Sequence, residues 1–157
     1  MSETIIVAPH PDDEIIGCYE KLMDDENVIV IYDPGTDSIR REEAMKLKDE
    51  LDNIKVQLFL ANIPPNLLTT ENTFYFPDPV YETHPLHRMY GSMGENIARG
   101  GFDVVFYNTN MLAPYIHESK NPGPKENLLE TVYPLQKELW KYEKKYVLFE
   151  GYCKWIF

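Results

Sequence analysis

Short apolar runs alternate with segments of helical periodicity along the first 60 residues of the chain. Three runs rich in β-branched residues predict buried strands at residues 4–8, 27–32 and 54–60. Apolar residues at spacings of three and four predict an amphipathic helix over residues 13–23. A second helix follows, capped by Thr36 or Ser38, with Ala44, Leu47 and Leu51 on one face. The order strand, helix, strand, helix, strand favours a parallel sheet with right-handed crossovers.

The pattern is less regular in the rest of the chain. Four prolines between residues 62 and 81 exclude a long helix there and leave room only for a short strand at 74–76. Apolar residues four apart, Met89, Met93 and Ile97, predict a helix over residues 87–99 that ends at Gly100 and precedes a strand at 102–107. Further elements are expected as a loop at 122–124, helical segments at 125–132 and 137–142 separated by Pro134, and a last strand in the aromatic tail 146–157.

These elements predict one α/β domain over residues 1–157. We expect a Rossmann-like, mostly parallel sheet with helices on both faces, which makes a three-layer sandwich.

Composition narrows the class of protein. The 157 residues include 15 Lys and Arg against 26 Asp and Glu, a formal net charge of −11, and 13% are aromatic. The aromatic content is typical of a folded domain, and the acidic excess argues against a broad basic face for nucleic acid or anionic lipid. The first residues lack a basic n-region, and the apolar run is too short for a signal peptide or a membrane span. We therefore expect a cytoplasmic protein.

Cysteine usage bears on the choice of metal ligands. Cys18 and Cys153 are the only cysteines and have no metal-type spacing, so the sequence predicts neither a disulfide framework nor a cysteine zinc site. A bound metal would have histidine and carboxylate ligands.

The segment His-Pro-Asp-Asp-Glu at residues 10–14 lies between the first strand and the first helix, the edge at which α/β sheets bind ligands. One interpretation is that Asp12 caps the helix and that Asp13 and Glu14 complement its positive end. That interpretation does not account for His10, which two prolines restrain beside these acids. Imidazole and carboxylate are zinc ligands, and a catalytic zinc site has three protein ligands. The sequence offers His84, His87 and His117 as further candidates.

Residues 7–14, Val-Ala-Pro-His-Pro-Asp-Asp-Glu, followed by Ile16-Gly17, resemble the opening motif of the PIG-L/LmbE-like family of metal-dependent N-deacetylases. Three later segments follow in the order of that family. Residues 35–44 are similar to its glycine turn and R-x-x-E-A helix, residues 83–88 to its H-P-D-H segment, and residues 125–136 to a segment reading K-x-x-L-L-x-x-Y-x-S-Q. The resemblance spans residues 4–136.

The resemblance implies a role for each matching residue. His10, Asp13 and His87 would hold the metal, usually zinc, while Asp12 would be the general base on the metal-bound water. His84 would polarise the carbonyl group or help to protonate the leaving amine, and Arg40 would contact the substrate. Adjacent side chains diverge, so Asp13 can bind a metal while Asp12 reaches a water molecule. We also expect His117, near Tyr115, to line the pocket.

The implied activity is that of a zinc-dependent hydrolase. It would remove an acyl group, expected to be acetyl, from a small-molecule amino sugar such as N-acetylglucosamine or from a sugar conjugate. Two departures from the family bear on this expectation. Leu86 stands where the family has Asp, and the Pro-rich residues 62–81 are too few for the helix that helps to shape the family's pocket.

Two alternatives differ in class from an enzyme. A family member that has lost turnover would keep the metal and act as a binding module. A phosphoacceptor receiver domain also has paired acids after its first strand, but it needs an acceptor Asp after its third strand. Residues 60–62, Leu-Ala-Asn, offer no such Asp.

Overall fold

A computed structural model describes residues 2–141 and 143–155 of the chain. Its main sheet has six strands in the order β3-β2-β1-β4-β5-β8. The strands are β1 (Thr4–Ala8), β2 (Val28–Tyr32), β3 (Ile54–Phe59), β4 (Thr73–Pro77), β5 (Asp103–Tyr107) and β8 (Tyr152–Lys154). All neighbours pair in parallel except β8, which is antiparallel to β5.

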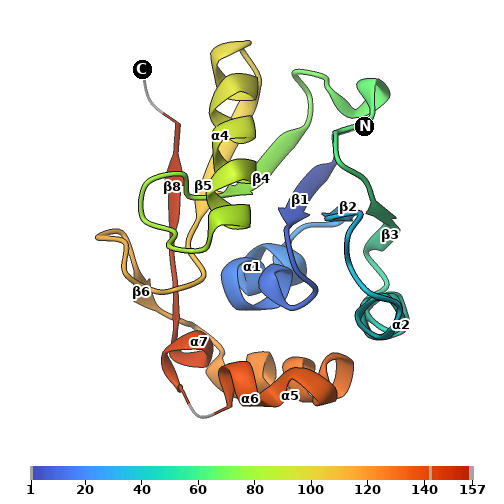
Figure 1. Ribbon diagram of the computed structural model, residues 1–157, viewed down its shortest axis with the longest axis vertical. Coiled ribbons are helices and arrows are strands. Elements are labelled where there is room, and N and C mark those ends of the chain that lie inside the picture. The colour runs from blue at the N-terminus through green and yellow to red at the C-terminus, as the bar shows by residue number, and fades with distance from the viewer. Residues whose placement is uncertain (1, 142, 156–157) are drawn as a thin grey trace.

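The helices connect these strands and cover the sheet (Figure 1). They are α1 (Asp13–Asp24), α2 (Ser38–Met45), α3 (Leu47–Glu50), α4 (Pro85–Arg99), α5 (Pro122–Val132), α6 (Lys137–Trp140) and α7 (Lys145–Leu148). Two 3-10 turns, η1 (Pro65–Leu67) and η2 (Pro134–Gln136), and a second small sheet of β6 (His117–Glu118) and β7 (Phe149–Glu150) complete the described elements.

Hydrophobic cores lie on both faces of the sheet because successive side chains of a strand point to opposite faces. From β1, Ile6 and Ala8 pack into a core shared with α1, α3 and α5, including Leu22 and Leu129. Ile5 and Val7 point the other way, into a core that includes Tyr90 and Ala98 of α4. The predicted Rossmann-like α/β class, with helices on both faces of a mostly parallel sheet, is confirmed.

The strand order places a crevice beside β1. The chain adds β2 and β3 on one side of β1 and then returns to add β4 and β5 on the other side. The connections after β1 and β4 therefore leave the sheet in different directions, which opens a ligand-binding crevice at the carboxyl ends of these strands. The same order opposes the receiver alternative, since receiver domains have the order 2-1-3-4-5.

Several local expectations were wrong. Asp37, rather than Thr36 or Ser38, caps α2 by accepting a hydrogen bond from the Arg40 amide. Residues 122–124 form the first turn of α5 rather than a loop, because proline fits the first helical positions, where no amide partner is needed.

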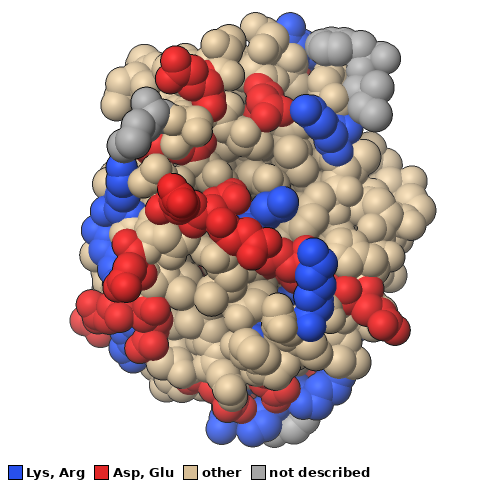
Figure 2. Space-filling model, turned by 180° about the vertical axis from the view of Figure 1, so that it is seen from behind, with Lys and Arg blue, Asp and Glu red and all other residues tan. Residues whose placement is uncertain are grey.

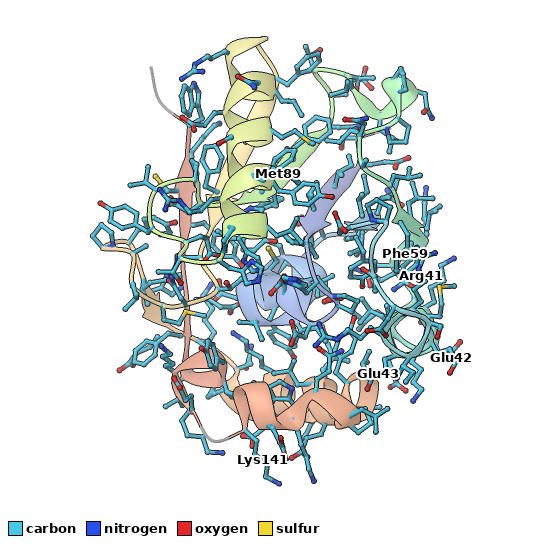
Figure 3. All side chains as sticks on the ribbon, in the orientation of Figure 1. Arg41, Glu42, Glu43, Phe59, Met89 and Lys141 are labelled. Atoms are coloured by element: carbon cyan, nitrogen blue, oxygen red, sulfur yellow. The ribbon has the colours of Figure 1, made fainter. Side chains whose placement is uncertain are left out.

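Helix α4 begins at Pro85, two residues before the expected start, and its buried face also differs from the expected one. Met89, labelled in Figure 3, is 52% exposed. Met93 and Ile97 are partly buried against the core, and the buried positions include Tyr90, Gly94 and Ala98. A Cβ at Gly94 would lie 2.7 Å from the ring of Phe76, so close packing against β4 requires glycine there.

The C-terminal tail is helical before it becomes a strand. Residues 145–148 form α7, and only residues 152–154 join the main sheet. The expected helix at 137–142 is the four-residue α6, and its expected last residue, 142, lies outside the described residues, as do residues 156 and 157 of the tail.

A buried ion pair interrupts α1 at Cys18, whose backbone is not helical (φ −132°, ψ 24°). Lys125 of α5 donates from Nζ to the Ile16 carbonyl at 2.8 Å, and Glu150 of β7 accepts from the Glu20 amide at 3.1 Å. An unbroken helix would pair this carbonyl with this amide. The two side chains thus join α5 and β7 to the middle of α1.

Acidic side chains gather on one face of the molecule (Figure 2). On the face in Figure 2, acidic side chains form a band across the middle, and lysine and arginine side chains lie singly among them. Within the described residues, no helix has the length and apolar character that a membrane crossing requires.

Candidate metal centre

The loop after β1 presents its acidic side chains to the crevice. Asp12 occupies the N-cap position of α1 with a left-handed backbone (φ 113°), which is uncommon for a residue other than glycine. Its carbonyl accepts from the amides of Ile15 and Ile16, but its side chain makes no capping hydrogen bond. The interpretation of the Asp12 side chain as a helix cap is therefore wrong. Its carboxylate is free to act in the cavity that it lines.

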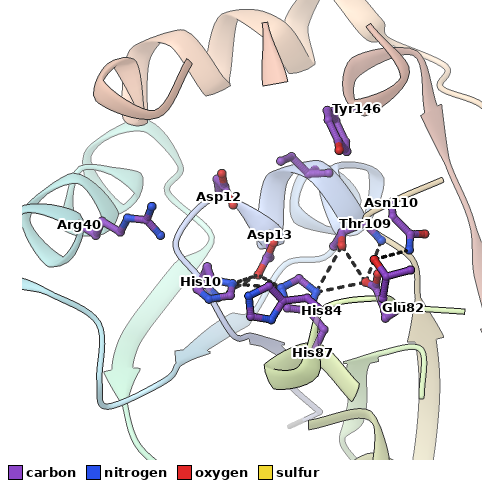
Figure 4. Close-up of a pocket in the computed structure, with 12 residues that line it drawn as sticks. His10, Asp12, Asp13, Arg40, Glu82, His84, His87, Thr109, Asn110 and Tyr146 are labelled. Carbon is purple, nitrogen blue, oxygen red and sulfur yellow. Dashed lines mark hydrogen bonds and ion pairs between the residues drawn. The ribbon is translucent and has the colours of Figure 1, made fainter. Parts of the chain in front are cut away.

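Three side chains converge beside Asp12. His10 Nδ1 lies 3.0 Å from His87 Nε2, which lies 3.0 Å from Asp13 Oδ2, and the third separation, His10 Nδ1 to Asp13 Oδ2, is 3.5 Å. Neighbouring ligands of a tetrahedral zinc with bonds of about 2.0–2.1 Å are separated by about 3.3 Å. Both the donor types and their spacing therefore fit a zinc ion (Figure 4).

Two residues that were not predicted from the sequence contact His87 at Nδ1, the ring nitrogen that does not face Asp13. Glu82, which follows β4, lies 3.3 Å through Oε1 from His87 Nδ1, and Thr109 Oγ1, which follows β5, lies 3.3 Å from the same nitrogen. Thr109 also donates to Glu82 Oε1 from its amide (2.9 Å) and its hydroxyl (2.7 Å). The Glu82 side chain is only 1% exposed. Glu82 precedes His87 by five residues but belongs to no recognisable ligand motif, and Thr109 follows His87 by 22 residues, so the sequence did not single out either of them.

His84 lies at the N-cap of α4, beside the ligands. Its Nδ1 accepts from the Leu86 amide at 3.1 Å, and its ring centroid lies 4.8 Å from that of His10. The backbone of Leu86 thus orients the imidazole, although the leucine side chain has no polar group that could do so. Since Nδ1 is the acceptor, neutral His84 carries its proton on Nε2.

Arg40 reaches the crevice from α2 and faces Asp12 (Figure 4). The crevice is a cavity of about 370 Å³. Besides the residues already described, it is lined by Ile16, Thr83, Asn110 and Tyr146. Tyr146 comes from α7, a helix that the sequence did not predict, and stands across the cavity from the histidines.

His117 does not join the other candidates. It belongs to β6, is exposed, and pairs through Nε2 with Glu20 Oε1 at 3.2 Å. It is not among the residues that line the cavity.

Burial and neighbouring charges shift the pKa values in the centre. Burial, together with Asp13 and Glu14 nearby, raises the pKa of Asp12 well above its usual value. Burial acts in the same direction on Asp13, but His87 and His10 outweigh it and lower the pKa of Asp13 below its usual value. For His87, burial lowers the pKa, but Asp13 and Glu82 outweigh burial and raise it to about 10. Asp13 and Glu82 thus favour positive charge at the position that His87 occupies.

The last of the family-like segments has structural partners around this centre. Tyr133 donates to Glu14, which Tyr32 also contacts, and Glu14 in turn accepts from the Asp12 amide at 2.8 Å. Gln136 donates to Glu43 of α2 at 3.0 Å. Residues 125–136 thus contact both the ligand loop and the helix that carries Arg40.

Comparisons of the chain with protein-family models, with curated proteins and with solved structures found no match.

Proposed function

We propose that the protein is a zinc-dependent hydrolase that removes an acyl group, most simply acetyl, from the amine of an amino sugar or sugar conjugate. The observation that carries the proposal is the buried Asp12 carboxylate beside three convergent ligands, free of any capping bond. A structural metal site closes its coordination with protein ligands, whereas His10, Asp13 and His87 leave one position of a tetrahedral ion open.

The residues of the chain divide the work of amide hydrolysis. Bound zinc would supply a Lewis acid that polarises the attacking water and the substrate carbonyl. Asp12 takes a proton from the water as the water oxygen bonds to the carbonyl carbon of the substrate. As the C–N bond breaks, Asp12 returns that proton to the leaving nitrogen, so a carboxylic acid and an amine are released. The raised pKa of Asp12 makes its carboxylate a stronger base than an ordinary aspartate, which suits a group that takes a proton from water.

His84 supports the reaction as a neutral hydrogen-bond donor. Burial and the neighbouring His10 and His87 lower its pKa, so the imidazole is uncharged at neutral pH. The Leu86 amide occupies Nδ1, which leaves the Nε2 hydrogen for the carbonyl oxygen as negative charge develops there. Protonation of the leaving amine is then assigned to Asp12.

Arg40 would recognise the substrate. Among the residues that line the cavity, Asp12, Asp13 and Glu82 are acidic, and Arg40 is a permanently charged cation. Its guanidinium can donate two parallel hydrogen bonds to sugar hydroxyls or to one anionic group.

An assay of acetate release tests the proposal. The zinc-loaded protein is incubated with N-acetylated sugars, sugar nucleotides and glycosides, and Asp12→Asn is compared with wild type. Loss of a general base costs about 10²- to 10⁴-fold in rate, and we expect that loss with zinc stoichiometry near one ion per chain unchanged. The introduced asparagine keeps the size of the side chain, so the fold is retained.

The alternative is a member that binds zinc without turnover, which Leu86 favours because the family's carboxylate beside His84 is replaced. Stoichiometric zinc with no hydrolysis across the panel would support this alternative. A protein that takes up no zinc would refute both.

A further inference from the structure

We infer that Glu82, with Thr109, is a positioning residue that fixes His87 as a metal ligand through Nε2. The inference rests on the metal centre of the proposed function, but it does not depend on the substrate. It gives a role to a buried acid that neither the composition nor the motifs identify.

The hydrogen-bond donors and acceptors around His87 determine which ring nitrogen carries the hydrogen. The Thr109 hydroxyl has one hydrogen, and it is directed to Glu82 Oε1 at 2.7 Å. The Thr109 oxygen and the Glu82 carboxylate therefore both face His87 Nδ1, at 3.3 Å each, as acceptors. A nitrogen between two acceptors carries the hydrogen, which leaves the lone pair of neutral His87 on Nε2. That nitrogen lies 3.0 Å from Asp13 Oδ2, within the ligand cluster.

Three separate elements build this arrangement. Glu82 lies after β4, His87 lies on α4, and Thr109 follows β5. A buried carboxylate is costly unless it is hydrogen-bonded or charge-paired, and Glu82 accepts from both the amide and the hydroxyl of Thr109. The formal charges of Asp13 and Glu82 together cancel that of a divalent ion. The charges of the two carboxylates that contact His87 are therefore balanced when a divalent metal is bound.

The arrangement also relates to the substitution at Leu86. Leu86 stands where the resemblance implies a carboxylate that orients His84, whereas Glu82 places a carboxylate beside His87. A carboxylate on the outer nitrogen of a ligating histidine fixes the ring and raises its basicity, and loss of such a partner costs about 10- to 100-fold in metal affinity.

Zinc affinity and the His87 tautomer test the inference together. Zinc dissociation constants are measured by chelator competition for wild type, Glu82→Gln and Glu82→Met. The amide oxygen of the introduced glutamine can accept the same hydrogens, so we expect a weakening of about tenfold or less. The introduced methionine fills the space without an acceptor and should weaken zinc by about 10- to 100-fold.

Glu43→Gln is the matched control, because Glu43 is an equally buried acid that accepts hydrogen bonds from Leu135 and Gln136 without contacting a ligand. Its zinc affinity should stay within about twofold of wild type.

Nitrogen-15 NMR of the zinc-loaded wild type shows which ring nitrogen of His87 carries the hydrogen. A purely structural role of Glu82 would predict no particular tautomer. We expect the His87 hydrogen on Nδ1, slowly exchanging, and retained in Glu82→Gln. Zinc on Nδ1 of His87, or a Glu82→Met affinity within about twofold of wild type, would overturn the role of Glu82. If the wild type binds no zinc, the metal centre fails and the proposed function with it. If zinc binds but no amide is hydrolysed, the proposed function alone fails, and the affinities still decide the role of Glu82.

Discussion

The ion pair of Lys125 and Glu150 yields a prediction about stability that is independent of the reaction. Lys125→Met removes an ammonium group that donates to the carbonyls of Ile16 (2.8 Å) and Phe149 (3.1 Å) and lies 3.8 Å from Glu150 Oε1. Both charged side chains are 0% exposed. The introduced methionine has a similar length and is apolar, so the change tests the charge and its hydrogen bonds rather than the volume.

The expected loss follows from burial. Removal of one partner of a buried ion pair costs about 3–5 kcal/mol, because the other charge and the freed carbonyl groups stay buried without a partner. Glu150 can relieve part of this cost by taking up a proton, so we expect about 3 kcal/mol near neutral pH. For a domain of this size, each kcal/mol lowers Tm by about 2–4 °C, which predicts a shift of about 6–12 °C.

The double variant Lys125→Met/Glu150→Gln removes both charges, so it separates the cost of an unpaired buried charge from the cost of losing the pair. The introduced glutamine can still accept from the Glu20 amide, and no buried charge is left unpaired. We therefore expect the double variant to be more stable than Lys125→Met alone by at least about 1 kcal/mol. Urea unfolding of the metal-free proteins measures both differences. The reasoning would be refuted if the loss in the double variant equalled the sum of the losses in Lys125→Met and in Glu150→Gln measured alone, or if Lys125→Met lost less than about 1 kcal/mol.

The pH dependence of the free energy of unfolding tests the same reasoning, because the sign of the change with pH is predicted. Burial raises the pKa of Glu150 to about 7, although Lys125 opposes that rise. Without Lys125, the pKa of Glu150 in the folded state rises further, while in the unfolded state it stays near 4.5. A group whose folded pKa is raised stabilises the protein at low pH and loses that contribution as the pH rises. The deficit of Lys125→Met relative to wild type is therefore expected to be larger at pH 8 than at about pH 5, and an equal or reversed deficit would contradict it.

Three further predictions concern the cavity. Addition of zinc at about 100 times its Kd should stabilise the protein by about 2.7 kcal/mol, measured as a rise in Tm that a chelator reverses, and His10→Ala should abolish that rise. Arg40→Met should raise KM for hydrolysis at least about tenfold with a smaller change in kcat, since a hydrogen bond from a charged donor is worth about 1.5–3 kcal/mol, and an unchanged KM would remove Arg40 from the substrate contacts. His117→Ala should alter neither zinc affinity nor kcat/KM, because His117 lies outside the cavity, and a loss of either would place it in the site after all.

The sequence predicted the main architecture because that information is local. The runs that became β1 and β2 are buried on both faces, so nearly every position is apolar, and their β-branched residues favour strands. The ligand loop could also be predicted from the sequence, since His10, Asp12 and Asp13 lie within four residues of one another and follow a strand. Their convergence with His87 follows once β1 and β4 are neighbours in the sheet.

Other expectations were wrong where packing overrides local pattern. Met89 fits the helical periodicity of α4 but is exposed, because Gly94 and Ala98 allow the opposite side of the helix to approach the sheet closely. His117 was expected in the pocket from its neighbourhood in the chain, yet β6 pairs with β7 and directs it to the surface beside Glu20.

The sequence by itself determined the α/β class and the chemical types of the candidate metal ligands. Both depend on residues that are neighbours in the chain, namely the apolar runs of the strands and the His-Pro-Asp-Asp-Glu segment. Only the tertiary structure decided how those ligands are supported. Glu82 and Thr109 are 27 residues apart and meet at His87, while Lys125 and Glu150 meet beside the break in α1. Such contacts depend on which strands lie side by side, and that order results from the packing of the whole sheet rather than from any local pattern.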